Sequence, residues 1–368
     1  MAGPSRRGFL AGLLAAGMAP QASWADLGDP AYLSAGKSSD GRFLLAGLDH
    51  AGGILFRHPL PARGHAAAAH PTRPEAVAFA RRPGQFADVI DCRTGAALAR
   101  LTPPTGHHFY GHGVFSPDGR SLFTTENAFE SGDGRIGIWD ASDGYRRIDD
   151  HASGGIGPHD IRLRTRPDGQ HDLVVANGGI QTHPDSGRAK LNLATMQPNL
   201  SYLSLEGTLR DQLILDADLR LNSIRHLSIH TDGTVGFAMQ WQGDLGADLP
   251  IIGLHRPGAA AHLMAEDDPR LRNLNGYGGS VAFSRDGTQI AVTSPRGGVV
   301  QIADCITGAL LREIRLTDVC GLASDANGFV VTTGQGLLAQ LSTSQADRPP
   351  HIRARTDLAW DNHLIPIA

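Results

Sequence analysis

A short pattern that recurs along the chain constrains its fold more than any other feature. An apolar strand, a turn built on Asp-Gly or Asn-Gly and a second apolar strand follow one another at six places. These turns are Asp40-Gly41, Asp118-Gly119, Asp168-Gly169, Asp232-Gly233, Asp286-Gly287 and Asn327-Gly328. Asp-Gly and Asn-Gly supply the positive φ that tight hairpins need, so each turn predicts a β-hairpin.

A second pattern begins where a strand ends in Asp, and continues with two residues and then Thr-Gly or Asp-Gly. It occupies residues 91–95, 140–144 and 304–308. The Asp side chain at the start can accept a hydrogen bond from the backbone two residues on. Together the two patterns make a four-stranded unit that repeats about every 40 to 50 residues, which is typical of a β-propeller.

We therefore predict an all-β fold, a seven-bladed β-propeller. Residues 26–368 number 343, and division by seven leaves 49 residues for each blade. The first blade, residues 30–61, is short of an inner strand, and the seventh, residues 317–346, is followed by a tail. Residues 358–364 of this tail can supply the missing strand, so that the C-terminal strand closes the ring. Six or eight blades also fit the spacing.

The N-terminus carries the features of an export signal. Arg6 and Arg7 precede a short apolar run, and Ser23 and Ala25 place small residues at the two positions that a signal peptidase reads. This arrangement predicts a Tat signal peptide over residues 1–25, cleaved after Ala25. We therefore expect a single propeller domain over residues 26–368, located in the periplasm.

Composition and charge exclude further classes of protein. No apolar run of 18 residues follows the N-terminus, so we expect no membrane span once the signal is removed. The net charge is -4 and no basic stripe stands out, which argues against nucleic acid as a partner. We expect a monomer. We also expect a fold that does not depend on disulfide bonds, because three cysteines cannot all pair.

Histidines recur at one position of the repeat. His112 and His226 each lie six residues before the Asp of the following turn, and His159 lies nine before it. His65 and His363 take the equivalent place in the second blade and in the closing strand. Inner strands line the axis of a propeller, so these five imidazoles are expected to form a ring at one end of it. Neutral imidazole binds transition metals, and we expect iron or copper. The alternative is structural, with each histidine bonded to an Asp of a neighbouring turn.

Other residues are candidates for supporting roles. Asp160, Glu126 and Asp361 could orient the imidazoles, and Cys320 falls close to the ring position in the seventh blade. A long insert in the fourth blade, around residues 177–197, is expected to act as a lid or to pack against a neighbouring blade. The candidates for an anion there, a carboxylate or a phosphate, are Arg188, Lys190, Asn192 and, on the sixth blade, Arg296.

Several chemistries have no sequence signal. The chain contains no Gly-x-Ser-x-Gly, no Walker loop and no His-Glu-x-x-His. Cys-x-x-Cys-His is also missing, so we expect neither covalent haem nor a nucleotide. No catalytic residue is assigned, and whether the protein is an enzyme stays open.

A set of longer motifs resembles one known family. They are residues 111–119, 157–160, 175–180, 191–193, 223–227, 294–297 and 360–363. The chain is identified as a member of the twin-arginine-exported family catalogued as domain of unknown function fifteen-thirteen, over essentially the whole mature chain. The resemblance implies a YVTN-like or quinoprotein-like seven-bladed propeller in the periplasm. Family members tend to be encoded beside imelysin-like and dihaem-peroxidase-like proteins, which implies a link to iron acquisition and to periplasmic iron-uptake partners.

Three functions fit these observations. The first is a periplasmic protein that binds iron or copper through the ring of histidines and serves metal uptake. The second is a propeller enzyme that uses the same metal, as a lactonase-like hydrolase or an oxidoreductase. The third is a scaffold that binds no metal and docks partner proteins on an exposed apolar or aromatic patch.

Overall fold

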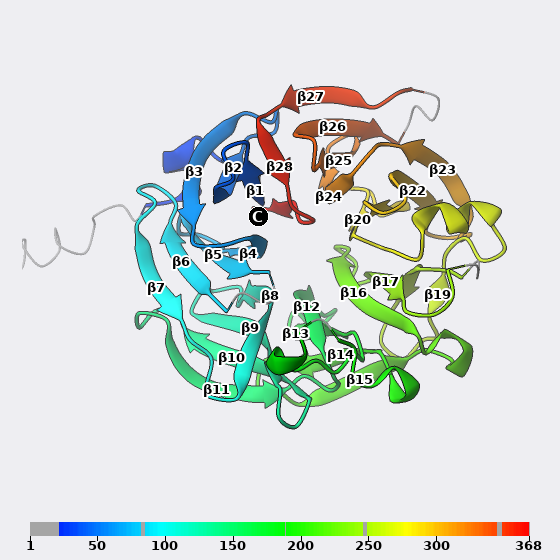
Figure 1. Cartoon of the computed structure of the whole chain (residues 1–368), viewed down its shortest axis with the longest axis horizontal. Helices are drawn as coiled ribbons and strands as arrows, with labels where there is room; N and C mark the ends of the chain where they lie inside the picture. Colours follow the sequence, from blue (N-terminus) through cyan, green and yellow to red (C-terminus); the bar gives the residue numbers. More distant parts are fainter. Residues whose placement is uncertain (1–21, 82–84, 188, 246–248, 344–347, 368) are drawn as a thin grey trace, which may run out of the picture.

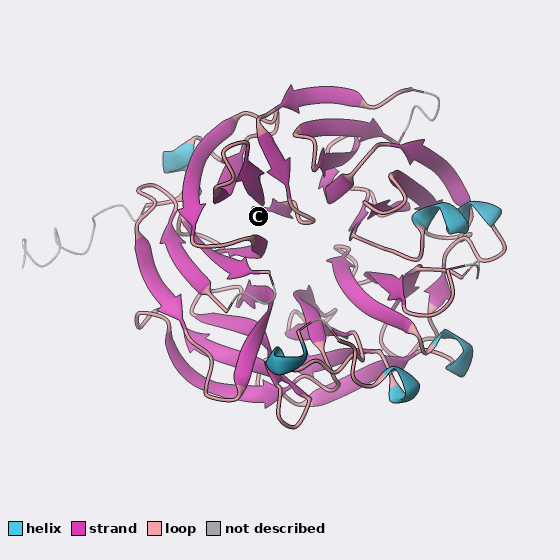
Figure 2. Cartoon of the chain, in the orientation of Figure 1, coloured by secondary structure: helices cyan, strands magenta, loops and turns pink. Residues whose placement is uncertain are grey.

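Seven antiparallel sheets surround a central axis in the computed structural model (Figure 1). The structure describes residues 22–81, 85–187, 189–245, 249–343 and 348–367. Nearly all of its regular structure is strand, and the helices described are short 3-10 turns in the connections (Figure 2). The prediction of a seven-bladed β-propeller is confirmed.

Each blade is one sheet, and its strands follow the chain outward from the axis. Blade 2 contains β4 (Gly64–Ala69), β5 (Glu75–Ala80), β6 (Ala87–Asp91) and β7 (Ala97–Leu101). Blade 3 contains β8 (His107–Phe115), β9 (Ser121–Ala128), β10 (Asp133–Asp140) and β11 (Arg146–Ala152). Blade 4 contains β12 (Pro158–Thr165), β13 (His171–Asn177), β14 (Asn199–Ser204) and β15 (Leu209–Ile214).

The next three blades repeat this order. Blade 5 contains β16 (Asn222–Ile229), β17 (Val235–Trp241), β18 (Ile252–His255) and β19 (His262–Leu263). Blade 6 contains β20 (Ser280–Phe283), β21 (Gln289–Ser294), β22 (Val299–Asp304) and β23 (Leu310–Arg315). Blade 7 contains β24 (Val319–Asp325), β25 (Gly328–Thr333), β26 (Leu337–Ser342) and β27 (His351–Arg355). The 3-10 turns are η1 (Trp24–Leu27), η2 (Pro184–Ser186), η3 (Leu193–Thr195), η4 (Ala217–Leu219) and η5 (Pro269–Leu274).

Blade 1 joins the two ends of the chain. Its own strands are β1 (Tyr32–Ser38), β2 (Phe43–Leu48) and β3 (Ile54–Leu60), and its inner edge is formed by β28 (Leu358–Trp360) and β29 (Ile365–Pro366). Both C-terminal strands run antiparallel to β1, as Figure 1 shows for β28. Closure of the ring by the C-terminal tail is confirmed. The seventh blade extends past the expected boundary at residue 346, because its outer strand is β27.

The turn chemistry explains why the strands end where they do. Asp91, Asp140 and Asp304 each accept a hydrogen bond from the backbone N–H two residues on, at 2.9, 2.9 and 3.0 Å. The glycines of the Asp-Gly turns have positive φ, for example 69° at Gly119 and 71° at Gly287. These local contacts bend the chain back after each strand, and apolar side chains of adjacent blades then pack face to face.

Candidate metal centre

Irregularities in the inner strands position the five candidate histidines. The register between the first and second strands of a blade shifts between Gly64 and Ala67, between Phe109 and Gly113, and between Pro158 and Asp160. His65, His112 and His159 lie within these shifts. A bulge of this kind turns a side chain out of the regular alternation. His226 lies at the corresponding shift in blade 5, and His363 lies between β28 and β29.

The structure brings all five of these side chains together. The ring centroid of His65 lies 4.9 Å from that of His112 and 4.7 Å from that of His363. The ring of His226 lies 4.8 Å from that of His159 and 4.9 Å from that of His363. All five are buried, with at most 9% of each residue exposed. Because they come from five different blades, they meet at the axis, and we call this group the five-histidine cluster.

Two overlapping sets of ring nitrogens could hold a metal ion. The first set is His65, His112 and His159, and the second is His112, His226 and His363. Within each set the ligand atoms all lie within 4.8 Å of one another. His112 belongs to both sets, so the two positions lie next to each other at the axis.

Asp160 orients the central histidine. Its Oδ1 lies 3.0 Å from Nδ1 of His112, and the carboxylate also accepts the backbone N–H groups of Ile161 and Leu227. Burial raises the pKa of Asp160, but the charge of Arg162 and the contact with His112 more than offset it, so the pKa lies well below its usual range. An ionised carboxylate can only accept, so His112 donates its Nδ1–H and turns Nε2 toward the cluster.

The other rings are oriented by similar contacts. His159 donates its Nδ1–H to the backbone carbonyl of Arg225 at 3.0 Å, which leaves its Nε2 as an acceptor. The Nε2 atoms of His65 and His112 lie 3.2 Å apart. When the His112 ring is neutral and holds its proton on Nδ1, His65 must supply the proton of this contact.

Burial keeps much of the cluster uncharged. Burial, together with the neighbouring His112, lowers the pKa of His226 to about 3. Burial, followed by the charge of Arg225, holds the pKa of His159 well below its ordinary value. Burial and the other imidazoles have the same effect on the pKa of His363. These three rings are therefore neutral near pH 7, which is the state that binds a metal.

Some of these nitrogens have no hydrogen-bond partner. Both ring nitrogens of His226 and Nε2 of His363 are buried and unpaired among the described residues. Leaving a buried polar group unsatisfied costs roughly 1–3 kcal/mol. Two rings from different blades bear this cost at one place, where the ligand atoms of three histidines lie within reach of a single ion.

Two of the supporting candidates, Glu126 and Asp361, are engaged in other contacts. Glu126 pairs with Arg147 at 2.7 Å and contacts His107 at 3.2 Å, so its carboxylate belongs to the sheet of blade 3. Asp361 pairs with Arg63 at 2.6 Å and Arg81 at 3.1 Å. These long-range pairs left no signal in the sequence.

Cys320 lies at the register shift of β24, but it is in neither set of ligand atoms found among the described residues. Its thiol donates to the backbone carbonyl of Asp318 at 3.0 Å. Burial raises the pKa of the thiol to about 12, so it remains protonated. A protonated thiol is a poor metal ligand.

The insert of blade 4 packs against both neighbouring blades. Ser223 on blade 5 donates to the carbonyl of Gly178, and Tyr110 on blade 3 contacts the hydroxyl of Thr182 at 3.2 Å. Asn192 holds the insert together, since it accepts from the backbone N–H of Gln181 and donates to the carbonyl of Gly179. Asn192 therefore has a structural role, and Arg188 lies outside the described residues.

Histidines outside the five-histidine cluster join adjacent blades. His70 of blade 2 contacts the carbonyl of Gly119 in the Asp-Gly turn of blade 3 at 3.1 Å. The ring of His230 in blade 5 lies over Gly287 of blade 6, where a Cβ would come within 2.3 Å of it. Neither of these joints was expected from the sequence. The sequence feature that could have predicted them is a histidine near the turn of one blade, followed by a glycine in the corresponding turn of the next blade.

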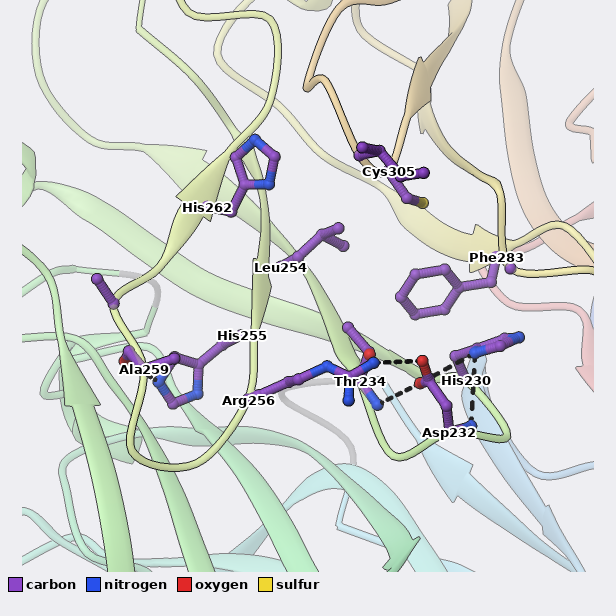
Figure 3. A pocket seen from close by; sticks show the side chains of 13 residues that line it. His230, Asp232, Thr234, Leu254, His255, Arg256, Ala259, His262, Phe283 and Cys305 are labelled. Atoms are coloured by element: carbon purple, nitrogen blue, oxygen red, sulfur yellow. Dashed lines mark hydrogen bonds and ion pairs between the residues drawn. The ribbon is translucent and has the colours of Figure 1, made fainter.

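A pocket of about 340 Å³ surrounds the second of these joints, between blades 5 and 6 (Figure 3). Three of its polar side chains contact one another: Asp232 binds Arg256 and lies 3.0 Å from His230. Burial raises the pKa of Cys305 to about 12, which makes its thiol unreactive. These contacts account for the pocket as part of a joint between blades.

The fold and the cluster define a class: a β-propeller whose inner-strand histidines converge at one end of the axis. The chain belongs to the family described as Protein of unknown function (DUF1513), which matches residues 58–367. No curated protein matches the chain. In the described residues, no helix is long and apolar enough to cross a membrane.

Solved structures share the fold at low sequence identity. Kuenenia stuttgartiensis hydrazine synthase is 13% identical with a TM-score of 0.58, and the match covers 89% of this chain and 95% of that one. U3-55K is 11% identical with a TM-score of 0.57, and the match covers 80% of this chain and 82% of that one. At this identity the likeness shows the propeller fold alone.

Proposed function

We propose that this protein is a periplasmic transition-metal-binding protein that holds iron or copper in the five-histidine cluster and serves metal acquisition. The observation that carries the proposal is the convergence of five buried imidazoles, of which His226 and His363 have unpaired ring nitrogens. A bound cation would satisfy these nitrogens together, whereas five buried rings without a ligand bear the cost of desolvation.

The spacing of the ring nitrogens supports the proposal. Two nitrogens that bind one tetrahedral ion at about 2.05 Å lie about 3.3 Å apart. The Nε2 atoms of His65 and His112 are separated by 3.2 Å. Asp160 and the carbonyl of Arg225 accept the Nδ1–H groups of His112 and His159, on the side of each ring away from its Nε2. Metal-bound histidines commonly have such hydrogen-bond partners.

The nature of the donors favours particular ions. Imidazole without thiolate suits zinc, copper, iron and nickel, and the usual order of affinity favours copper. Export of the folded protein would allow the cytoplasm to choose the ion, and the family resemblance favours iron.

The alternatives have less support in the geometry. A metal-dependent hydrolase or oxidoreductase needs an available acid or base, yet Glu126 is paired with Arg147 and Asp160 is occupied by His112. A docking scaffold needs exposed aromatic groups, yet Phe109 and Tyr110 are buried and Tyr277 and Trp241 are half-buried.

The test is the metal content of the full chain, expressed with its own N-terminus and measured by mass spectrometry. We expect near-stoichiometric iron or copper in the native protein, and its loss in a His112→Ala, His159→Ala, His226→Ala variant. His262→Ala, at an exposed histidine outside the cluster, is the matched control. Circular dichroism and a His226→Gln single variant separate loss of metal from loss of fold. A folded native protein that takes up neither iron nor copper after incubation would exclude the proposal.

A further inference from the structure

Positive side chains gather around the cluster at the end of the propeller where the inner strands begin. The insert after β13 and the connection after β21 lie at this same end, because each follows the second strand of its blade. Arg225 stands next to His226 in the register shift of β16. The insert carries Lys190 and the connection carries Arg296. We call Lys190, Arg225 and Arg296 the cationic rim.

The rim is in contact with the residues that build the cluster. The backbone carbonyl of Arg225 holds His159. The side chain of Arg225 lies against the start of the insert, with its Nε 3.4 Å from where a Cβ on Gly178 would stand. The Arg296 guanidinium stacks on Tyr277 at 4.6 Å, and the Tyr277 hydroxyl accepts from Asn362, the neighbour of His363.

The three rim charges act on one another and on the histidines. Burial lowers the pKa of Lys190, and the positive charges of Arg225 and Arg296 lower it further. The charge of Arg225 also contributes to the lowered pKa of His159 and of His226. Lys190 and Arg296 are exposed and have no ion-pair partner among the described residues.

The balance of charge around the cluster is positive. Asp160 contacts His112, Asp361 lies two residues before His363, and Asp318 contacts Cys320. These three negative charges are outnumbered by positive ones. Arg63 and Arg81 pair with Asp361, Arg162 pairs with Asp160, and the cationic rim adds three more. The histidines add no negative charge. A bare metal cation would add to this excess of positive charge.

We infer that the metal binds together with a small anion bearing carboxylate or phosphate oxygens, which Lys190, Arg225 and Arg296 hold over the five-histidine cluster. Arginine binds such oxygens in bidentate pairs, and the anion would also fill the metal's remaining coordination position. The cargo is therefore a metal–oxyanion complex rather than the aqua ion. This inference rests on the proposed function.

The test is calorimetric titration of citrate and of inorganic phosphate into the metal-loaded and the metal-free full chain. We expect the loaded protein to bind one of the two anions about tenfold more tightly or better than the metal-free protein. A Lys190→Gln, Arg296→Gln variant should lose about tenfold in anion affinity and keep its metal, because each rim contact is charge-assisted. Lys37→Gln, at the exposed lysine of β1, is the matched control.

The outcomes separate the two proposals, because metal content is measured independently by mass spectrometry. Equal anion affinity with and without metal, or in the variant and the native protein, would overturn the joint site and leave the metal site standing. A folded chain that holds no metal would overturn both. Preference for citrate over phosphate, or the reverse, would support the inference and name the oxyanion. Arg225→Gln provides a second variant should the double variant be poorly folded.

Discussion

The Nε2 atoms of His65 and His112 lie 3.2 Å apart, although one ring is carried by blade 2 and the other by blade 3. This contact exists because both inner strands are irregular at the same level of the axis. The same irregularity recurs in blades 4 and 5 and in the gap between β28 and β29. The cluster is thus a consequence of a repeated bulge.

Asp160→Asn should weaken metal binding without abolishing it. The substitution removes the charge that holds the Nδ1–H of His112, and loss of such a partner typically costs about 10- to 100-fold in affinity. Competition with a chelator of known affinity measures the change. Asp118→Asn, at an exposed turn residue, should leave the affinity as it is. An Asp160 variant that binds metal as tightly as the native protein would show that Asp160 does not contribute to metal binding.

The metal-free protein should lose stability on acidification. Burial lowers the pKa of His226 to about 3, whereas an imidazole in the unfolded chain titrates near its model value of 6.5. The unfolded state therefore binds more protons between these values, so the stability held above pH 6.5 falls as the pH approaches 3. Urea denaturation at several pH values measures this slope, and His226→Gln should reduce it. A flat profile in the native protein would contradict the burial of a neutral ring.

Trp24→Ala should destabilise the propeller by about 3 kcal/mol or more. Trp24 is 5% exposed, packs with the core of blades 1 and 2, and donates its indole N–H to the carbonyl of His70 at 2.9 Å. Cleavage after Ala25 would remove this contact. A chain that begins at Asp26 should therefore melt at a lower temperature than one that begins at Ala22. Equal melting temperatures would mean that the indole contributes no stability.

Replacement of Arg6 and Arg7 by lysine should stop export. The paired arginines are the feature on which the twin-arginine signal depends, and residues 1–21 lie outside the described part of the chain. Fractionation of cells that express the full chain measures the periplasmic share. Replacement of the exposed Arg120 by lysine is the control, and periplasmic protein at the native level in the Arg6, Arg7 variant would contradict the Tat assignment.

Sequence reasoning reached those parts of the site that share a position in the repeat. Alignment on the Asp-Gly turns found His112, His159 and His226. Because the inner strand of each blade leads into the same kind of turn, residues at a similar distance before the turn lie at a similar level along the propeller axis. It also found Asp160, which lies next to His159. It also nominated Glu126, and nothing near Glu126 in the chain indicates that Arg147 takes its carboxylate.

Taken alone, the sequence determined the turns, the strand order and the closure of the ring. Each of these depends on contacts between residues close together in the chain, such as Asp91 with the N–H of Arg93, or on a repeat that can be counted. Tertiary structure alone decided which charges meet at the axis. Arg63 and Asp361 are 298 residues apart and become partners only when the ring closes. Which nitrogens remain unpaired, and how much positive charge surrounds them, follow from packing between blades that no local pattern encodes.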